Sequence, residues 1–187
     1  MRLQGSGRLL AHELVLVAIL AVLTAWRLMS GNWILGMEIL LWWLGGLLGF
    51  ILVFADGVIY AFWQKPEDVL AMKMRDIFGR GRWQKGLVRM LGEEEKSDES
   101  ILRSVLFLGV FLVMGILAAT SVASPLGRGF MVGLGMHLWM DLMADFLWKK
   151  RDVKLWFWQI KREIEDNEVK GVVWGFTILF WLLVWNL

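Results

Sequence analysis

The stretch Phe130–Lys150, FMVGLGMHLWMDLMADFLWKK, decides the fold. It is apolar enough to cross a bilayer, yet it carries His137, Asp141 and Asp145, which are four residues apart. On a helix this spacing places all three side chains in one stripe along a single face. An ionisable group at the centre of a bilayer costs at least about 2.5 kcal/mol, so three on one face are a functional-site hypothesis. The pattern predicts a membrane helix surrounded by the rest of the chain.

The composition is typical of a polytopic membrane protein. The 187 residues are 58% hydrophobic, with a mean hydropathy of +0.57. No segment has the strand-length alternation of an outer-membrane barrel, so we expect an all-α, polytopic transmembrane helical bundle. The sequence has no Cys, which excludes disulfides, thiolate metal sites and cysteine nucleophiles. Many of the 13 Trp lie near the ends of apolar runs, which is typical of a bilayer interface.

Five apolar runs predict five spans in a single membrane domain of residues 1–187. The spans cover about 9–29, 33–63, 101–122, 130–149 and 171–187, with loops at 64–100 and 150–170. The first run lacks a convincing small-residue cleavage site, so we expect a retained helix; cleavage would leave four spans. The short connection at 124–129 predicts an antiparallel hairpin of the third and fourth spans. Apolar periodicity predicts amphipathic interfacial helices in both long loops, the second of them carrying Val153, Phe157, Ile160 and Ile164.

The distribution of positive charge predicts the orientation. With the N-terminus in the cytoplasm, 18 of the 20 Lys and Arg residues lie on the cytoplasmic side. We therefore expect an inner (cytoplasmic) membrane protein with its C-terminus outside.

The expected partners are the lipid bilayer and anionic lipid headgroups, and nothing beyond charge favours nucleic acid. The predicted headgroup contacts are Arg80, Arg82, Lys85, Arg89, Lys149, Lys150 and Arg151. Two GxxxG pairs, Gly45/Gly49 and Gly129/Gly133, let helices approach closely and offer faces for a homo-oligomer.

Ionisable groups from three predicted spans share the cytoplasmic half of the membrane. They are His12, Glu13, Asp56, His137, Asp141 and Asp145. Imidazole and carboxylate are ligands for Zn²⁺, Mn²⁺ or Fe²⁺, and a pair four residues apart on a helix can reach one ion. One interpretation is thus a divalent-metal site on His137 and Asp141, completed by Asp56 or His12, with Asp145 or Glu13 as a catalytic base.

Two other interpretations remain open. A ladder of Glu38, Asp56, Asp141 and Asp145 suits a proton or cation path in a small transporter or channel. Alternatively, the polar groups pair with one another inside a non-enzymatic oligomer, and Asp145 pairs with Lys149 at the helix end.

Residues 135–142, GMHLWMDL, resemble the G-x-H-L-x-x-D-L helix of YdjM-type membrane-bound metal-dependent hydrolases. The resemblance implies metal-dependent hydrolysis of a lipid or phosphoester, with His137 and Asp141 as ligands. It also implies that His12 stands for the family's N-terminal histidine. The family's Thr-His-Ser segment has no counterpart here.

Overall fold

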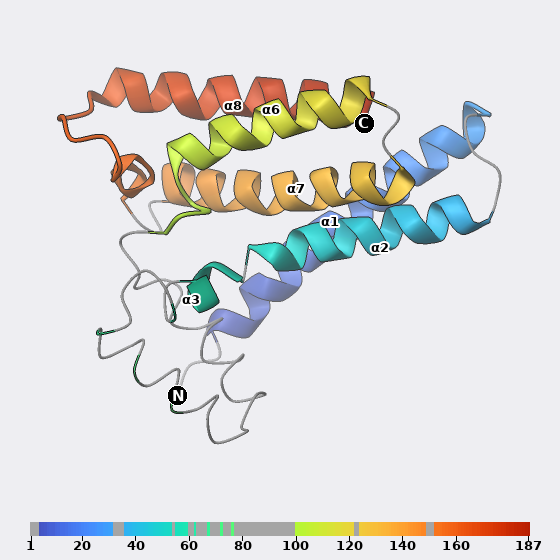
Figure 1. Cartoon of the computed structure of the whole chain (residues 1–187), viewed down its shortest axis with the longest axis horizontal. Coiled ribbons are helices and arrows are strands. Elements are labelled where there is room, and N and C mark those ends of the chain that lie inside the picture. The colour runs from blue at the N-terminus through green and yellow to red at the C-terminus, as the bar shows by residue number, and fades with distance from the viewer. Residues whose placement is uncertain are drawn as a thin grey trace.

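A computed structural model of the chain shows a bundle of helices built around one central helix (Figure 1). The structure describes residues 4–31, 36–53, 55–59, 62, 67, 72, 76, 100–121, 124–148 and 152–187, without the side chains of 4–12, 57 and 58. Every regular element in these ranges is a helix, which confirms the all-α class for this part of the chain.

The elements follow one another as in Figure 1. They are α1 (Gln4–Met29), α2 (Met37–Leu52), α3 (Ala55–Ile59), α6 (Val105–Thr120), α7 (Pro125–Trp148), the 3₁₀ helix η3 (Val153–Phe157) and α8 (Asp166–Asn186). In Figure 1, α7 lies in the middle, α6 and α8 cover one side, and α1 and α2 cover the other. The expected antiparallel hairpin is formed by α6 and α7.

Helix α7 is the core of the molecule because almost every residue from Gly129 to Asp145 is buried. Its closest neighbour is α2, and glycines allow the approach. A Cβ at Gly133 would overlap the backbone of Gly46, and one at Gly49 would overlap the carbonyl oxygen of Phe130. Gly45 and Gly129 are equally close to the opposite backbone. The two GxxxG pairs that we expected to serve an oligomer thus pack against each other within one chain.

Local capping explains where three helices begin. The Ser104 side chain accepts a hydrogen bond from the Phe107 backbone amide at 3.2 Å, which starts α6 at Val105. Ser124 does the same for Gly127 at 3.3 Å, and Pro125 takes the first position of α7, where its missing N–H costs nothing. Glu165 and Glu168 form a capping box that starts α8.

Several predicted boundaries were wrong. The run 33–63 does not form one helix within the described residues, because α2 ends at Leu52 and the short α3 follows at Ala55. Helix α6 begins at Val105 and not at 101, so Arg103 precedes it, whereas α7 and α8 begin earlier than predicted.

The amphipathic helix predicted within 150–170 is reduced to one turn, η3, and residues 158–165 are not helical. The chain must reverse here to bring α8 back along α7, and side-chain contacts of this segment hold it across the end of the bundle. The surface helices predicted in 64–100 lie outside the described residues.

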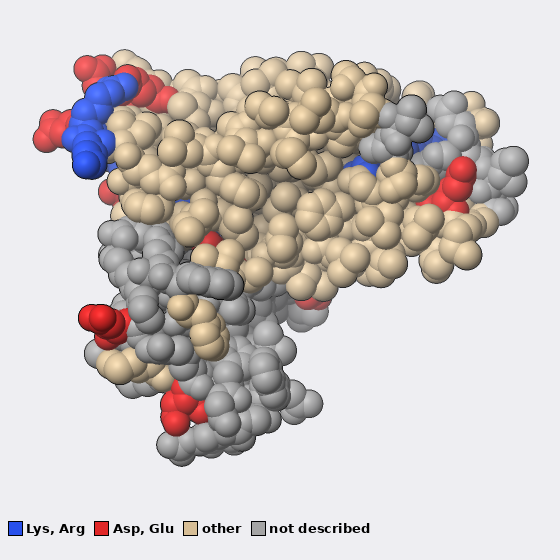
Figure 2. All heavy atoms as spheres, in the orientation of Figure 1, with Lys and Arg blue, Asp and Glu red and all other residues tan. Residues whose placement is uncertain are grey.

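Among the helices that the structure describes, α7 and α8 are long and apolar enough to cross a membrane by length and composition, whereas α2 and α6 are apolar but shorter. The described surface between the two ends of the bundle is mostly free of charged side chains (Figure 2). Large apolar side chains are exposed there, among them Leu44 and Leu48 on α2, Val110 and Val113 on α6, and Ile178 on α8. Soluble monomers rarely expose apolar faces of this extent.

Candidate functional site

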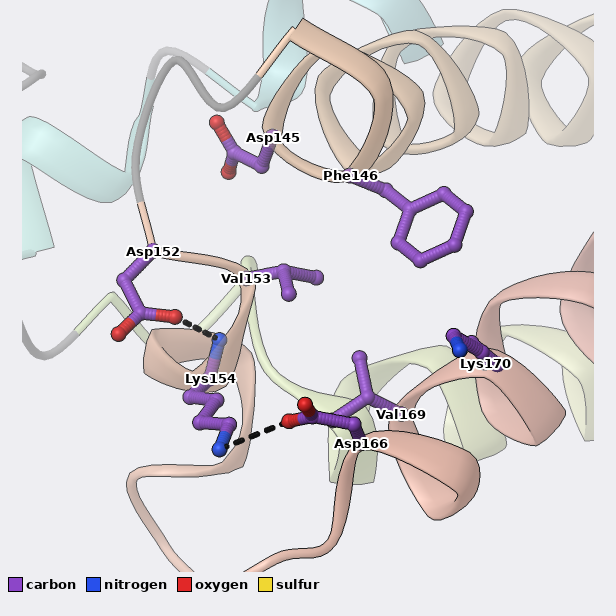
Figure 3. A pocket seen from close by; sticks show the side chains of 8 residues that line it. All are labelled: Asp145, Phe146, Asp152, Val153, Lys154, Asp166, Val169 and Lys170. Atoms are coloured by element: carbon purple, nitrogen blue, oxygen red, sulfur yellow. Dashed lines mark hydrogen bonds and ion pairs between the residues drawn. The ribbon is translucent and has the colours of Figure 1, made fainter.

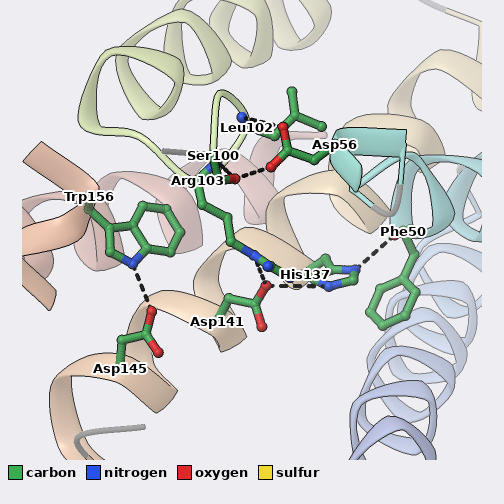
Figure 4. A network of polar contacts seen from close by, with 9 residues as sticks. All are labelled: Phe50, Asp56, Ser100, Leu102, Arg103, His137, Asp141, Asp145 and Trp156. Atoms are coloured by element: carbon green, nitrogen blue, oxygen red, sulfur yellow. Dashed lines mark hydrogen bonds and ion pairs between the residues drawn. The ribbon is translucent and has the colours of Figure 1, made fainter. Parts of the chain in front are cut away.

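The polar stripe of α7 points into the bundle. His137, Asp141 and Asp145 are only 2%, 6% and 5% exposed. Their neighbours come from α2, from residues 100–104 and from η3, at the end of the bundle where α3 and η3 lie (Figures 1 and 4). Buried charges of this kind require partners, and each of the three has one.

His137 is held between two acceptors (Figure 4). Its Nδ1 lies 2.8 Å from the carbonyl oxygen of Phe50, and its Nε2 lies 3.4 Å from Oδ2 of Asp141. A carbonyl oxygen only accepts, so Nδ1 carries a hydrogen. In the neutral ring the lone pair of Nε2 then faces a carboxylate oxygen, whereas a protonated ring has a hydrogen for each acceptor.

Asp141 is also the partner of Arg103. The Nε of Arg103 donates to Oδ2 of Asp141 at 2.8 Å, and the two side chains are 10% and 7% exposed. The same carboxylate oxygen therefore faces both a guanidinium and an imidazole. Arg103 lies in the non-helical segment before α6.

Asp56 joins the cluster through the same segment. Its carboxylate accepts hydrogen bonds from the Ser100 hydroxyl and, at 3.2 Å, from the Leu102 backbone amide. The Ser100 hydroxyl oxygen in turn accepts from the Arg103 amide at 3.1 Å. Asp56 thus fixes the backbone that carries Arg103, and acts on Asp141 through it (Figure 4).

Asp145 and the η3 region close this end of the bundle. The indole Nε1 of Trp156 donates to Oδ2 of Asp145 at 2.9 Å, and the indole of Trp158 donates to the Ser100 carbonyl at 3.1 Å. Trp156 and Trp158 are thus both hydrogen-bonded to residues of the polar cluster.

Other predicted site residues lie apart from the cluster or outside the described part. Glu13 is exposed on α1, and the side chain of His12 is not described. Glu38 is exposed in the first turn of α2, 12 residues and so about 18 Å along the helix from Phe50. The predicted headgroup residues, Arg80, Arg82, Lys85, Arg89, Lys149, Lys150 and Arg151, all lie outside the described ranges.

The described donors do not fit a divalent metal as they are arranged. No group of three His, Asp or Glu side chains within the described ranges could hold one ion. Arg103 already occupies the Asp141 oxygen nearest to His137, and a second cation there would be repelled by the guanidinium. Asp56 is committed to Ser100 and Leu102.

Exposed ion pairs at the same end lie outside the cluster. Lys154 pairs with Asp166 at 3.0 Å, and this hydrogen bond and charge raise the pKa of the Lys154 ammonium above its usual value. Arg162 binds both carboxylate oxygens of Glu168, at 2.9 and 2.6 Å. These pairs orient the start of α8 and contribute little stability, since both are exposed.

Sequence reasoning missed Arg103 and Ser100 as parts of the site. Arg103 stood out only as the single charge at the start of an apolar run, and its partner is 38 residues away. The available signal was that one apolar run has a single cation, Arg103, at its start, whereas the next carries buried carboxylates. Because buried charges need partners, the two could have been paired.

Chemically, the arrangement is a buried acid, Asp141, shared between a permanent cation and an imidazole that can gain or lose a proton. No family model matches this chain, and no curated protein or solved structure matches it either.

Proposed function

We propose that this chain is a polytopic protein of the cytoplasmic membrane that acts as a small proton-coupled transporter or channel, with His137 as its proton-binding group. The observation that carries the proposal is the position of the buried imidazole between two acceptors, the Phe50 carbonyl and the Asp141 carboxylate. Binding of one proton turns the contact of Nε2 with Asp141 from repulsive to attractive.

Protonation of His137 also changes the strength of the ion pair between Arg103 and Asp141. With an imidazolium beside it, the Asp141 carboxylate has two cationic partners, so the pair with Arg103 weakens. Arg103 is carried by residues 100–104, which Asp56 and Trp158 tie to α3 and to the η3 region. The proton is in this way coupled to the packing of three elements at the cytoplasmic end.

The membrane location and the five spans are part of the proposal. They are supported by the spanning length of α7 and α8 in the described part of the chain, by the exposed apolar faces of α2 and α6, and by the position of the charged side chains at the ends of the bundle (Figure 2). The bias of Lys and Arg in the sequence supports the proposed orientation, with the N-terminus inside and the cluster facing the cytoplasm.

The first test is proton flux into liposomes that contain the purified protein and an internal pH dye, driven by a potassium diffusion potential. We expect flux from the wild type, and no flux above protein-free liposomes from His137→Gln or Asp141→Asn. Glu163→Gln, an exposed carboxylate outside the cluster, is the matched control and should conduct as the wild type does. Wild-type flux in the His137 variant would refute the proposal.

A second measurement does not depend on transport. The chain has two histidines, so His12→Gln leaves His137 as the single imidazole for nitrogen NMR. We expect the ring to carry hydrogen on Nδ1, which faces the Phe50 carbonyl, and the Nε2 signal to shift in Asp141→Asn. An Nε2 signal that Asp141→Asn leaves unchanged would contradict the contact on which the proposal rests.

The second candidate is a divalent-metal hydrolase, as the resemblance implies. One distance favours it, since the 3.4 Å between Nε2 of His137 and Oδ2 of Asp141 is about the separation of two ligands on one tetrahedral zinc. It requires Arg103 to leave Asp141. Metal content of the purified wild type, with His137→Gln as control, separates the two: stoichiometric metal lost in the variant favours the hydrolase.

A further inference from the structure

A pocket lies beside the cluster, between the end of α7, η3 and the start of α8 (Figure 3). Its volume is about 530 Å³, which is within the usual range of small-molecule pockets, about 300–1,000 Å³. It is lined by Asp145, Phe146, Asp152, Val153, Lys154, Asp166, Val169 and Lys170. The proposed proton site does not use this pocket, apart from the shared neighbour Asp145.

The lining carries both signs of charge. Three carboxylates face two ammonium groups, so the pocket is formally negative by one charge. Lys154 is paired with Asp166 at 3.0 Å, whereas no carboxylate of the described residues lies within 4 Å of the Lys170 ammonium. A ligand that fits this lining carries a cationic group for the carboxylates and an anionic group for Lys170.

The charges are ordered along the bundle. Lys170 lies one turn, about 6 Å, further along α8 than Asp166, toward the apolar part of the helix. Asp152 and Asp166 lie at the outer rim, before and at the start of their helices. In the proposed orientation the anionic group of the ligand lies deeper in the membrane than its cationic group.

An apolar surface continues from the pocket toward the membrane. Phe146 and Val169 line it, and Phe146 packs edge-on against Trp174 at 6.3 Å between ring centroids. Trp174 and Trp148 are 51% and 74% exposed. Exposed tryptophans of this kind are typical of the level of the lipid headgroups. A ligand with an acyl chain would thus find an apolar path beyond its phosphate.

We propose that this pocket binds the headgroup of a phospholipid with a primary ammonium, such as phosphatidylethanolamine, its phosphate at Lys170 and its ammonium at Asp152 and at the Asp166 carboxylate oxygen that Lys154 does not bind. The proposal rests on the membrane location proposed above. A primary ammonium has three hydrogens for carboxylates, whereas the trimethylammonium of choline has none, so the pocket discriminates between the two lipids.

The experiment is native mass spectrometry of the full-length protein in detergent, with dioleoyl phosphatidylethanolamine, phosphatidylcholine and phosphatidylglycerol added at equal concentration. We expect the ethanolamine lipid to be retained about two- to fivefold more than the others. Lys170→Gln should reduce retention of all three, and Asp166→Asn should remove the preference over choline. The controls Lys161→Gln and Glu163→Gln, exposed and outside the pocket, should behave as the wild type.

Equal retention of the ethanolamine and choline lipids, or full retention by Lys170→Gln, would overturn the proposal. Equal binding of water-soluble glycerophosphoethanolamine would overturn the assignment to a membrane lipid. Failure here is separable from failure of the proton site, because His137→Gln should retain lipid as the wild type does and Lys170→Gln should conduct protons normally.

Discussion

Arg103 and Asp141 form an ion pair whose side chains are only 10% and 7% exposed, so removing one partner leaves the other charge buried. Arg103→Gln removes the guanidinium that pairs with the buried Asp141 carboxylate, so we expect a loss of about 3–5 kcal/mol in the free energy of unfolding. Arg103→Met combined with Asp141→Leu should lose much less, since it removes both charges of the pair together. Unfolding of the purified protein in micelles measures both. A single variant as stable as the wild type would mean that the pair is not formed.

Trp156 and Trp158 allow a matched comparison of two indole hydrogen bonds. Trp156→Phe removes a donor to the buried Asp145 carboxylate, and we expect a loss of about 1.5–3 kcal/mol. Trp158→Phe removes a donor to a neutral carbonyl, for which the expected loss is about 0.5–1.5 kcal/mol. The same unfolding measurement compares them. Equal losses would show that the charge of Asp145 adds nothing to its contact with Trp156.

At the residue scale, the sequence predicts which polar side chains are buried but not which of them contact one another. The periodicity of α7 predicts that His137, Asp141 and Asp145 share a face, and all three are buried. Arg103 and Ser100 come from a loop whose path depends on tertiary packing. No local pattern near residue 100 predicts a contact with Asp56, 44 residues away.

At the scale of elements, the glycines between α2 and α7 determine how closely these helices pack. Gly133→Ala adds a methyl group where the Gly46 backbone lies, so the helices must separate, and we expect a loss of about 1–3 kcal/mol or more. Gly175→Ala is the matched control, because nothing lies within 4 Å of its added Cβ. There the alanine should stabilise α8 by up to about 1 kcal/mol. Equal effects of the two variants in an unfolding measurement would refute close packing at Gly133.

Element boundaries were predicted less well than the elements themselves, and the reason differs between sites. Capping by Ser124, and by Glu165 with Glu168, involves residues close together in the sequence. The earlier starts of α7 and α8 could therefore have been predicted from these capping residues. The reason that the predicted helix does not form over 153–164 lies in contacts with distant parts of the chain. There Trp156 and Phe157 are buried and the chain has to turn, so tertiary contacts override the apolar spacing.

At the scale of the whole molecule, the apolar runs and the Gly pairs were enough to predict an all-α fold and close helix packing. For the site, only the buried acids and His137 could be predicted. Their partners could not, because the arrangement of the other helices around α7 depends on tertiary packing and not on any single stretch of sequence. The proposed five spans and their orientation remain predictions, and they can be tested on the molecule as a whole.

The chain has no Cys, so single cysteines can report its orientation without a background of other thiols. Ser30 and Glu163 are both exposed, and the proposed topology places them on opposite sides of the membrane. In intact cells a membrane-impermeant maleimide should label Ser30→Cys and should label Glu163→Cys only after the membrane is permeabilised. The reverse pattern would invert the orientation and turn the polar cluster outward. Labelling of both in intact cells would contradict the membrane crossing between them, because a bilayer that separates the two sites must protect one thiol.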